Sequence, residues 1–242
     1  MSIDNTGSNY TIVVAGDSIS EGIIYDEKKG KYTILSANYV NLLKSTINGY
    51  IKNISKFGDT LLKGAQKLRE YLSKNKSDVV IIEFGGNDCD FYWEEISKNP
   101  DGNHKPKTDI DIFKEKLNEL IKFLNFSHII SILMTLPPLN ANNYFKWISK
   151  NNEEVGKNIL EWLGSIDKIY LWQEKYSFAI ADVAKETNTK LIDIRNAFLN
   201  YSDFKQLICI DGIHPNAKGH EIIAKEVYKC LKNNYEYLTM GM

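Results

Sequence analysis

Hydrophobic and polar positions alternate along the chain on two length scales. Short apolar runs are separated by longer segments in which apolar residues recur at spacings of three and four, as in Leu61, Ala65, Leu68 and Leu72. This alternation is typical of βα units around a mostly parallel sheet. The candidate strands cover residues 10–15, 51–54, 78–84, 128–134 and 190–194. We therefore expect an α/β protein with five strands.

The third and fourth apolar runs, DVVIIEF and HIISILM, are apolar nearly throughout, which indicates central strands covered on both faces. Helices over residues 36–47, 59–73 and 109–124 are expected to provide that cover. Asp59 and Thr60 are candidate N-caps of the second helix, and Pro215 begins a last helix that runs to about residue 231.

Residues 137–186 exceed what a minimal sheet needs and hold three of the four tryptophans. From residue 165 onward the pattern predicts one long helix packed on the sheet. We interpret residues 141–164 as a helical insertion within a single domain that spans residues 1–242. Such an insertion either caps the site or only adds to the core, and the pattern favours neither.

Composition and charge restrict the size of the core, the binding partners and the cellular location that we expect. A 242-residue chain that is 43% hydrophobic can bury one substantial core. The 30 basic and 31 acidic residues form no basic tract, which argues against a nucleic acid partner. The polar start MSIDNTGSNY carries no secretory signal, and no apolar run is long enough to span a bilayer. Cys89, Cys209 and Cys230 show no CxxC or zinc-ligand spacing, which suits a reducing compartment. Together these observations predict a cytoplasmic protein without stable membrane insertion.

Two short motifs near opposite ends of the chain contain the side chains of a hydrolytic triad. GDSIS places Ser18 where the first strand opens into a loop, and DGIHP contains Asp211 and His214. A serine hydroxyl needs a base to accept its proton and a carboxylate to orient that base. With Gly212 easing the turn, the carboxylate can bond one ring nitrogen of His214 while the other faces Ser18.

Two further motifs supply candidate donors for the oxyanion of an acyl-transfer intermediate. FGDT places Gly58 after a candidate strand, where a bare backbone N–H can approach a ligand closely. FGGND places Asn87 at the carboxyl end of the third strand. Because the carboxyl ends of parallel strands share one edge of the sheet, we expect Ser18, Gly58 and Asn87 to converge there.

With these four motifs, in this order, the chain resembles the SGNH hydrolases, also called the GDSL esterase/lipase superfamily. The motifs are GDS, the glycine block with Gly58, GGND and DGIHP, and they span nearly the whole chain. The resemblance implies a flavodoxin-like three-layer α/β/α sandwich and a Ser18 nucleophile with His214 as its base, oriented by Asp211. It also implies an oxyanion hole made by the backbone N–H groups of Ser18 and Gly58 and the side-chain amide of Asn87.

Other polar residues have plainer interpretations. A serine after an aspartate is an ordinary helix cap, so Ser18 gains its catalytic interpretation from the accompanying motifs. We take His104, His128 and His220 as structural, although His104 follows GGND in a polar loop and is the least settled. We interpret the acidic residues of that loop as solvated, because no histidine joins them at ligand spacing. Tyr92 and Trp93 either stack on a sugar ring or pack beneath the insertion. The acidic residues are Asp88, Asp90, Glu94 and Glu95.

The function that we predict is hydrolysis of carboxylic esters through an acyl-enzyme, with no metal and no organic cofactor. The aromatic loops favour a short-acyl esterase or a deacetylase of carbohydrates. An acyl lipid, as in a lysophospholipase or a thioesterase, remains the alternative substrate. Two non-catalytic alternatives are a flavodoxin-like module that receives a phosphate or flavin and a carbohydrate-binding relative. Both leave DGIHP and Asn87 without a role.

Overall fold

The computed structural model describes residues 10–240 and contains a five-stranded parallel sheet with the strand order β4-β1-β5-β6-β7. The expectation that the segment MSIDNTGSNY is not a secretory signal falls outside the described residues, which include only Tyr10 of that segment. All five strands expected from the apolar runs are confirmed, and none of their ends differs from expectation by more than two residues. They are β1 (Tyr10–Gly16), β4 (Gly49–Asn53), β5 (Val79–Glu83), β6 (Ile130–Met134) and β7 (Lys190–Ile192).

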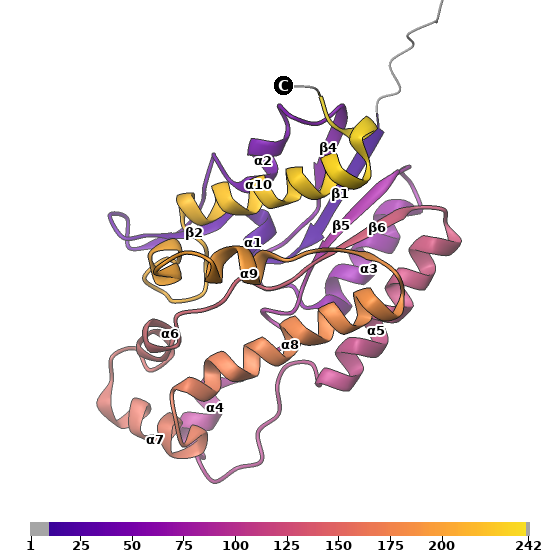
Figure 1. The fold of residues 1–242 in the computed structure, drawn as a ribbon. Coiled ribbons are helices and arrows are strands. Elements are labelled where there is room, and N and C mark those ends of the chain that lie inside the picture. Colours follow the sequence, from indigo (N-terminus) through magenta and orange to yellow (C-terminus); the bar gives the residue numbers. More distant parts are fainter. Residues whose placement is uncertain (1–9, 241–242) are drawn as a thin grey trace, which may run out of the picture.

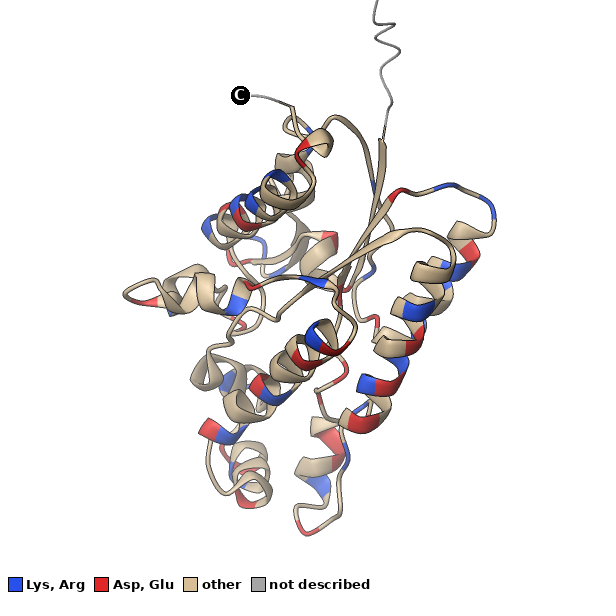
Figure 2. Cartoon of the chain, turned by 45° about the vertical axis from the view of Figure 1, so that its right-hand side comes forward, with Lys and Arg blue, Asp and Glu red and all other residues tan. Residues whose placement is uncertain are grey.

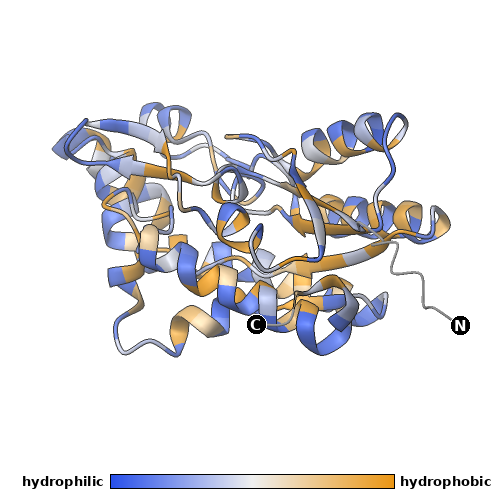
Figure 3. Cartoon of the chain, turned by 90° about the horizontal axis from the view of Figure 1, so that it is seen from above, coloured by the Kyte–Doolittle hydropathy of each residue, from blue (hydrophilic) through white to orange (hydrophobic). Residues whose placement is uncertain are grey.

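Successive residues of each strand point to opposite faces of the sheet, and each face carries its own hydrophobic cluster. Ile12 and Val14 pack with α2 (Tyr39–Leu43), α9 (Ile194–Leu199) and α10 (Ala217–Asn234). Val13 and Ala15 pack with α3 (Leu61–Leu72), α5 (Ile110–Phe126) and α8 (Asp167–Glu186). Figure 1 shows these two helical layers on either side of the sheet, and Figure 3 shows hydrophobic residues along the strands. The flavodoxin-like α/β/α sandwich is therefore confirmed.

Helices α3 and α5 lie close to the expected ranges 59–73 and 109–124, whereas α2 is clearly shorter than the expected range 36–47. Helix α5 begins after Asp109, whose side chain accepts a hydrogen bond from the backbone N–H of Asp111. The helix expected over residues 36–47 is only α2, because Asn38 caps it at the start and the chain turns after Leu43 toward β4. His128, expected at the start of a strand, instead adopts a positive φ of 56° before β6 begins.

A short antiparallel hairpin, β2 (Ile23–Asp26) and β3 (Lys31–Ile34), follows the first helical turn α1 (Ser18–Glu21) and was not expected from the sequence. Asp26 begins its turn by accepting hydrogen bonds from the backbone N–H groups of Lys28 and Lys29. The hairpin has only four residues in each strand and is largely half-exposed, so its hydrophobic alternation is weak.

Four helical segments lie beyond the carboxyl ends of the strands (Figure 1). These are α4 (Trp93–Lys98), α6 (Ala141–Ile148), α7 (Glu153–Leu163) and the start of α8. They share a third hydrophobic cluster that includes Phe91, Ile96 and Ile159. The extra segment at residues 141–164 therefore forms two helices with a core of their own above the sheet edge. The remaining elements are the 3-10 helices η1 (Phe204–Leu207) and η2 (Glu236–Leu238).

Charges of both signs are mixed along the outer faces of the helices (Figure 2). Within residues 10–240, no helix is both long enough and apolar enough to cross a membrane.

Candidate active site

Ser18 is held just beyond the carboxyl end of strand β1, which lies between β4 and β5. Asp17 caps the short helix α1, because its side chain accepts a hydrogen bond of 3.0 Å from the backbone N–H of Ile19. Ser18 is the first residue of that helix and is 8% exposed. The strand and the capped turn thus fix the direction of a serine hydroxyl that still reaches the surface.

Asp211 and His214 lie in the loop between η1 and α10, as expected from DGIHP. Nε2 of His214 is 2.8 Å from Oγ of Ser18, and Nδ1 is 2.5 Å from Oδ2 of Asp211. Burial opposes ionisation of the Asp211 carboxyl, but the hydrogen bond from His214 and its charge outweigh that effect and hold the pKa of Asp211 below its usual value. The three side chains therefore touch in series, with the carboxylate ionised at neutral pH.

The loop that carries His214 is tied down on both sides. The backbone N–H of Cys209 donates to the carbonyl of His214 at 2.8 Å, and the N–H of Asn140 donates to the carbonyl of Gly212 at the same distance. Gly212 has a φ of 83°, and a Cβ there would lie 2.4 Å from the backbone nitrogen of Tyr144. Only glycine therefore allows this loop to pack directly against the start of α6.

Gly58 and Asn87 reach the same edge of the sheet. The amide Nδ2 of Asn87 donates to Oδ2 of Asp17 at 3.2 Å and to the carbonyl of Asp59 at 3.1 Å. Gly58 lies between Asp59 and Phe57, whose ring stacks on His214 at a centroid distance of 6.1 Å. The backbone N–H of Gly58 donates no hydrogen bond to any residue among those described. The side chains of Ser18, His214 and Asp211 are thus in contact, Asn87 is tied to the turn of Ser18 through Asp17, and Gly58 follows the residue that stacks on His214.

An aromatic cover over His214 was not anticipated from the sequence. Tyr32 of the unexpected hairpin meets the imidazole edge-on at 5.3 Å, beside Phe57, whose ring centroid lies 5.4 Å from that of Tyr32. Trp147 of α6 contacts Tyr32 and Tyr25, so the hairpin and the inserted helices meet above the imidazole. The pKa of the Tyr32 hydroxyl is raised above its usual value, mainly by burial and then by the Asp211 carboxylate. A tyrosine-rich pair of short strands after GDSIS is the only sequence signal for this cover.

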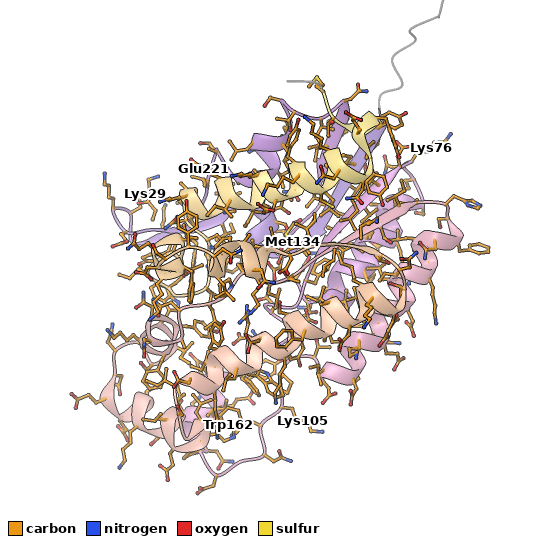
Figure 4. The ribbon with its side chains drawn as sticks, viewed as in Figure 1. Lys29, Lys76, Lys105, Met134, Trp162 and Glu221 are labelled. Atoms are coloured by element: carbon orange, nitrogen blue, oxygen red, sulfur yellow. The ribbon has the colours of Figure 1, made fainter. Side chains whose placement is uncertain are left out.

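A pocket of about 590 Å³ opens directly beside Ser18 and His214. Its walls are mostly apolar and aromatic and come from six separate stretches of the chain. The inserted helices contribute Tyr144, Trp162 and Leu163 to these walls. Figure 4 shows Trp162 at the end of the molecule that lies farthest from the chain termini. The other apolar wall residues include Phe91, Trp93, Leu136, Leu139, Ile169, Leu171, Trp172 and Ile213.

Several polar groups in the pocket wall are hydrogen-bonded within the protein. Asp90 accepts hydrogen bonds from Nε1 of Trp93 and from the hydroxyl of Tyr144, both at 2.7 Å, and pairs with Lys107 at 2.8 Å. Nε1 of Trp172 donates to the carbonyl of Cys89 at 3.0 Å. The wall therefore offers a bound molecule mainly apolar surface.

The interpretation of the acidic loop as solvated is correct for Glu94 and Glu95 and wrong for its first two acids. Asp88 is 0% exposed and accepts hydrogen bonds from the backbone N–H of Leu61 at 3.0 and 3.1 Å, which anchors helix α3. Asp90 is drawn inward by the donors of the pocket wall. Within residues 10–240, no three His, Cys, Asp or Glu side chains gather in a way that could hold a metal ion.

The other histidines and the aromatic pair have separate positions. His104 lines the pocket, where its ring meets Trp162 edge-on at 5.7 Å while Nε2 bonds the carbonyl of Asn99 at 2.7 Å. His220 is buried in α10, and burial lowers its pKa to about 4. Trp93 packs beneath the inserted helices, whereas Tyr92 is 56% exposed.

Comparison with known proteins identifies the same family as the four sequence motifs. The family model described as GDSL-like Lipase/Acylhydrolase matches residues 12–227. GDSL esterase/lipase CPRD49 of Arabidopsis thaliana is 26% identical over 155 residues, which cover 64% of this chain and 54% of that protein. The chain thus spans about half the length of this relative.

Two solved structures share the fold. The lipase/acylhydrolase from Enterococcus faecalis superposes with a TM-score of 0.64 at 22% identity, covering 93% of this chain and 96% of that one. An acetylxylan esterase from Geobacillus stearothermophilus superposes with a TM-score of 0.64 at 19% identity, covering 97% and 99%. Because the family model extends over most of the sequence, from the first strand to the last helix, the chain belongs to the GDSL-like lipase/acylhydrolase family of ester hydrolases.

Proposed function

We propose that the protein is a serine hydrolase that cleaves carboxylic esters through an acyl-enzyme, with Ser18 as nucleophile. The observation that carries this proposal is the continuous contact from Oγ of Ser18 to Nε2 of His214, at 2.8 Å, and from Nδ1 to Asp211. A serine that merely capped a helix would have no reason to meet an imidazole from a loop 196 residues away.

In the first half of the reaction, Nε2 of His214 takes the proton of Ser18 as Oγ bonds to the ester carbonyl carbon. The carbonyl oxygen becomes an oxyanion, for which the proposed donors are the backbone N–H groups of Ser18 and Gly58 and the side-chain amide of Asn87. Asn87 already donates to the neutral Asp59 carbonyl, and a developing negative charge is the stronger acceptor. When the intermediate collapses, the C–O bond to the alcohol breaks and His214 returns the proton to the departing oxygen.

In the second half, water replaces the alcohol. His214 accepts a proton from the water as its oxygen attacks the acyl carbon, and the bond to Ser18 then breaks with return of that proton to Oγ. The products are a carboxylic acid and an alcohol, and the enzyme is regenerated. Asp211 remains ionised throughout and stabilises the imidazolium, as its lowered pKa requires.

The volume and the apolar walls of the pocket indicate which class of ester fits the site. An acetyl group would fill only a small part of 590 Å³, whereas an apolar chain or ring system would contact its aromatic walls. The sequence favours a small acyl group and a carbohydrate, but sugar hydroxyls need free hydrogen-bonding partners, and Asp90, Trp93, Tyr144 and Trp172 already bond within the protein. We therefore favour an ester with an extended apolar acyl group over an acetylated carbohydrate.

Replacement of single residues tests the catalytic assignment. With a p-nitrophenyl ester, Ser18→Ala should abolish turnover, and Asn87→Ala should lower kcat by about 10²- to 10³-fold through loss of one oxyanion donor. Ser45→Ala, at an exposed serine whose hydroxyl bonds only the Leu42 carbonyl, serves as the matched control and should leave kcat unchanged. Turnover by Ser18→Ala at the rate of this control would refute the role of Ser18.

A further inference from the structure

Two buried carboxyl groups lie directly beneath the turn that carries the proposed nucleophile. Asp17 is 1% exposed and Glu83, the last residue of β5, is 0% exposed. Gly16, the residue before Asp17, pairs with Glu83 across β1 and β5, so the two carboxyl groups are neighbours, and each shifts the pKa of the other. Neither forms an ion pair with a lysine or arginine among residues 10–240. A pair of adjacent carboxylates without a cation is costly in a protein interior, so the two groups cannot both be charged.

The hydrogen bonds around the pair indicate which carboxyl holds the charge. Asp17 accepts the backbone N–H of Ile19 at 3.0 Å and Nδ2 of Asn87 at 3.2 Å, so donors serve both of its oxygens. Glu83 accepts only the hydroxyl of Ser20, at 2.8 Å on Oε2, and its buried Oε1 accepts no hydrogen bond from any described residue. An ionised carboxylate needs donors at both oxygens, whereas a neutral acid does not.

The groups that face this pair from other elements do not supply a compensating charge. Tyr39 of α2 shares the Ser20 hydroxyl at 2.6 Å, and burial raises the pKa of its phenol, so it stays neutral. His220 of α10 stacks on Tyr39, and its lowered pKa keeps it neutral as well. A positive charge on His214, as the imidazolium of the proposed reaction, favours ionisation of Asp17.

The directions in which the pKa values of Asp17 and Glu83 are shifted agree with the hydrogen-bond pattern. Burial raises the pKa of Asp17 to about 6, so it is mostly ionised at neutral pH. Burial, and then the Asp17 charge, raise the pKa of Glu83 well above its usual value.

We propose that Glu83 is a neutral carboxylic acid whose O–H donates to the Asp17 carboxylate and thereby positions Asn87 and the Ser18 turn. Glu83 touches neither the substrate nor the reacting atoms, so it is a positioning residue and not a catalytic one. It acts through Asp17, which bonds the turn at Ile19 and the oxyanion donor at Asn87. The inference rests on the proposed function for its kinetic consequence but not for the protonation state of Glu83.

Three variants separate a neutral donor from a charged or merely space-filling residue. Glu83→Gln retains a donor toward Asp17 and an acceptor for Ser20, so kcat should stay within about tenfold of the wild-type value. Glu83→Leu fills similar space without either group, and kcat should fall by about 10²-fold because Asn87 loses its fixed position, with a smaller change in KM. Glu83→Asp keeps the ionisable group but is one methylene too short, so it should be more impaired than Glu83→Gln. If Glu83→Gln were as impaired as Glu83→Leu, the neutral-donor role would be wrong.

Infrared difference spectroscopy tests the protonation state independently of turnover and of the leucine variant. The spectrum of the wild type minus that of Glu83→Gln at neutral pH should contain the C=O stretch of a protonated carboxylic acid, shifted in D₂O. A difference spectrum with only carboxylate bands would overturn the proposal. Because this readout needs no substrate, its failure is distinct from a failure of Ser18→Ala to lose activity, which would refute the proposed function instead.

Discussion

The apolar pocket beside Ser18 predicts how the rate depends on the length of the acyl chain. The perturbation is the addition of methylene groups to a p-nitrophenyl ester, from acetyl to octanoyl, at concentrations below micelle formation. A methylene occupies about as much space as a water molecule, roughly 30 Å³, so an octanoyl chain needs about 240 Å³. That volume is well within the 590 Å³ of the pocket.

Each buried methylene contributes about 0.8 kcal/mol, which corresponds to about a fourfold gain in kcat/KM. Six additional methylenes give an upper limit of about 5 kcal/mol, from which the ordering of the flexible chain must be subtracted. We therefore expect octanoyl to exceed acetyl by about 10²-fold in kcat/KM. The ratio of the two values is the measured quantity, because it cancels differences in the amount of active enzyme.

A pair of matched variants assigns this preference to the pocket. Leu171 lines the pocket and is 51% exposed, so Leu171→Trp can narrow the space without disturbing the core. Leu160 on α7 is 38% exposed and is not a pocket residue, which makes Leu160→Trp the control. The octanoyl preference should fall at least tenfold in Leu171→Trp and stay at the wild-type value in Leu160→Trp. A flat or falling series in the wild type, or equal effects of the two variants, would refute this use of the pocket.

Further predictions concern the loops and the buried histidine. Gly212→Ala should lower kcat by about 10²-fold, because the new Cβ would lie 2.4 Å from the backbone nitrogen of Tyr144 and displace His214. In Gly58→Ala the new Cβ has no neighbour within 4 Å, and only the backbone strain of its φ of 77°, about 1 kcal/mol, opposes the change. The value of kcat should therefore fall far less than in Gly212→Ala, and equal losses in the two variants would contradict the packing argument. The pKa of His220 is lowered from 6.5 to about 4 in the folded state, so between these pH values the residue is protonated in the unfolded state but not in the folded state. The free energy of unfolding therefore decreases as the pH falls below about 6.5. Urea unfolding should show that the wild type loses about 2 kcal/mol more than His220→Gln between pH 7 and pH 5, whereas parallel curves would exclude that contribution.

Much of the fold could be predicted because its strands are short apolar runs bounded by polar turns. Strands β5 and β6 are buried on both faces, and their continuous hydrophobic sequences indicate this directly. The β2–β3 hairpin escaped prediction because its partly exposed residues contribute little to any core. Helix α2 was expected to be longer, since apolar spacing does not reveal that Asn38 caps the helix and delays its start.

Sequence motifs identified the triad side chains that the structure brings into contact, whereas contacts between distant segments could not be predicted from the sequence. Ser18, Asp211 and His214 could be named because each stands in a short motif, and the structure brings them into contact. Asp88 could not be recognised as a buried anchor, because its partner is a backbone N–H 27 residues earlier in the chain. Glu83 ends an apolar run, and a charged residue in such a place is a signal for a buried ionisable group.

Covalent labelling tests the central claim, the activation of Ser18 by His214, without knowledge of the substrate. A fluorophosphonate reacts only with an activated serine, and mass spectrometry of the digested protein locates the adduct. The account predicts one adduct, on the peptide that contains Ser18, and loss of that adduct in His214→Ala. An unlabelled wild-type protein, or an adduct on another serine while Ser18 remains free, would contradict the account.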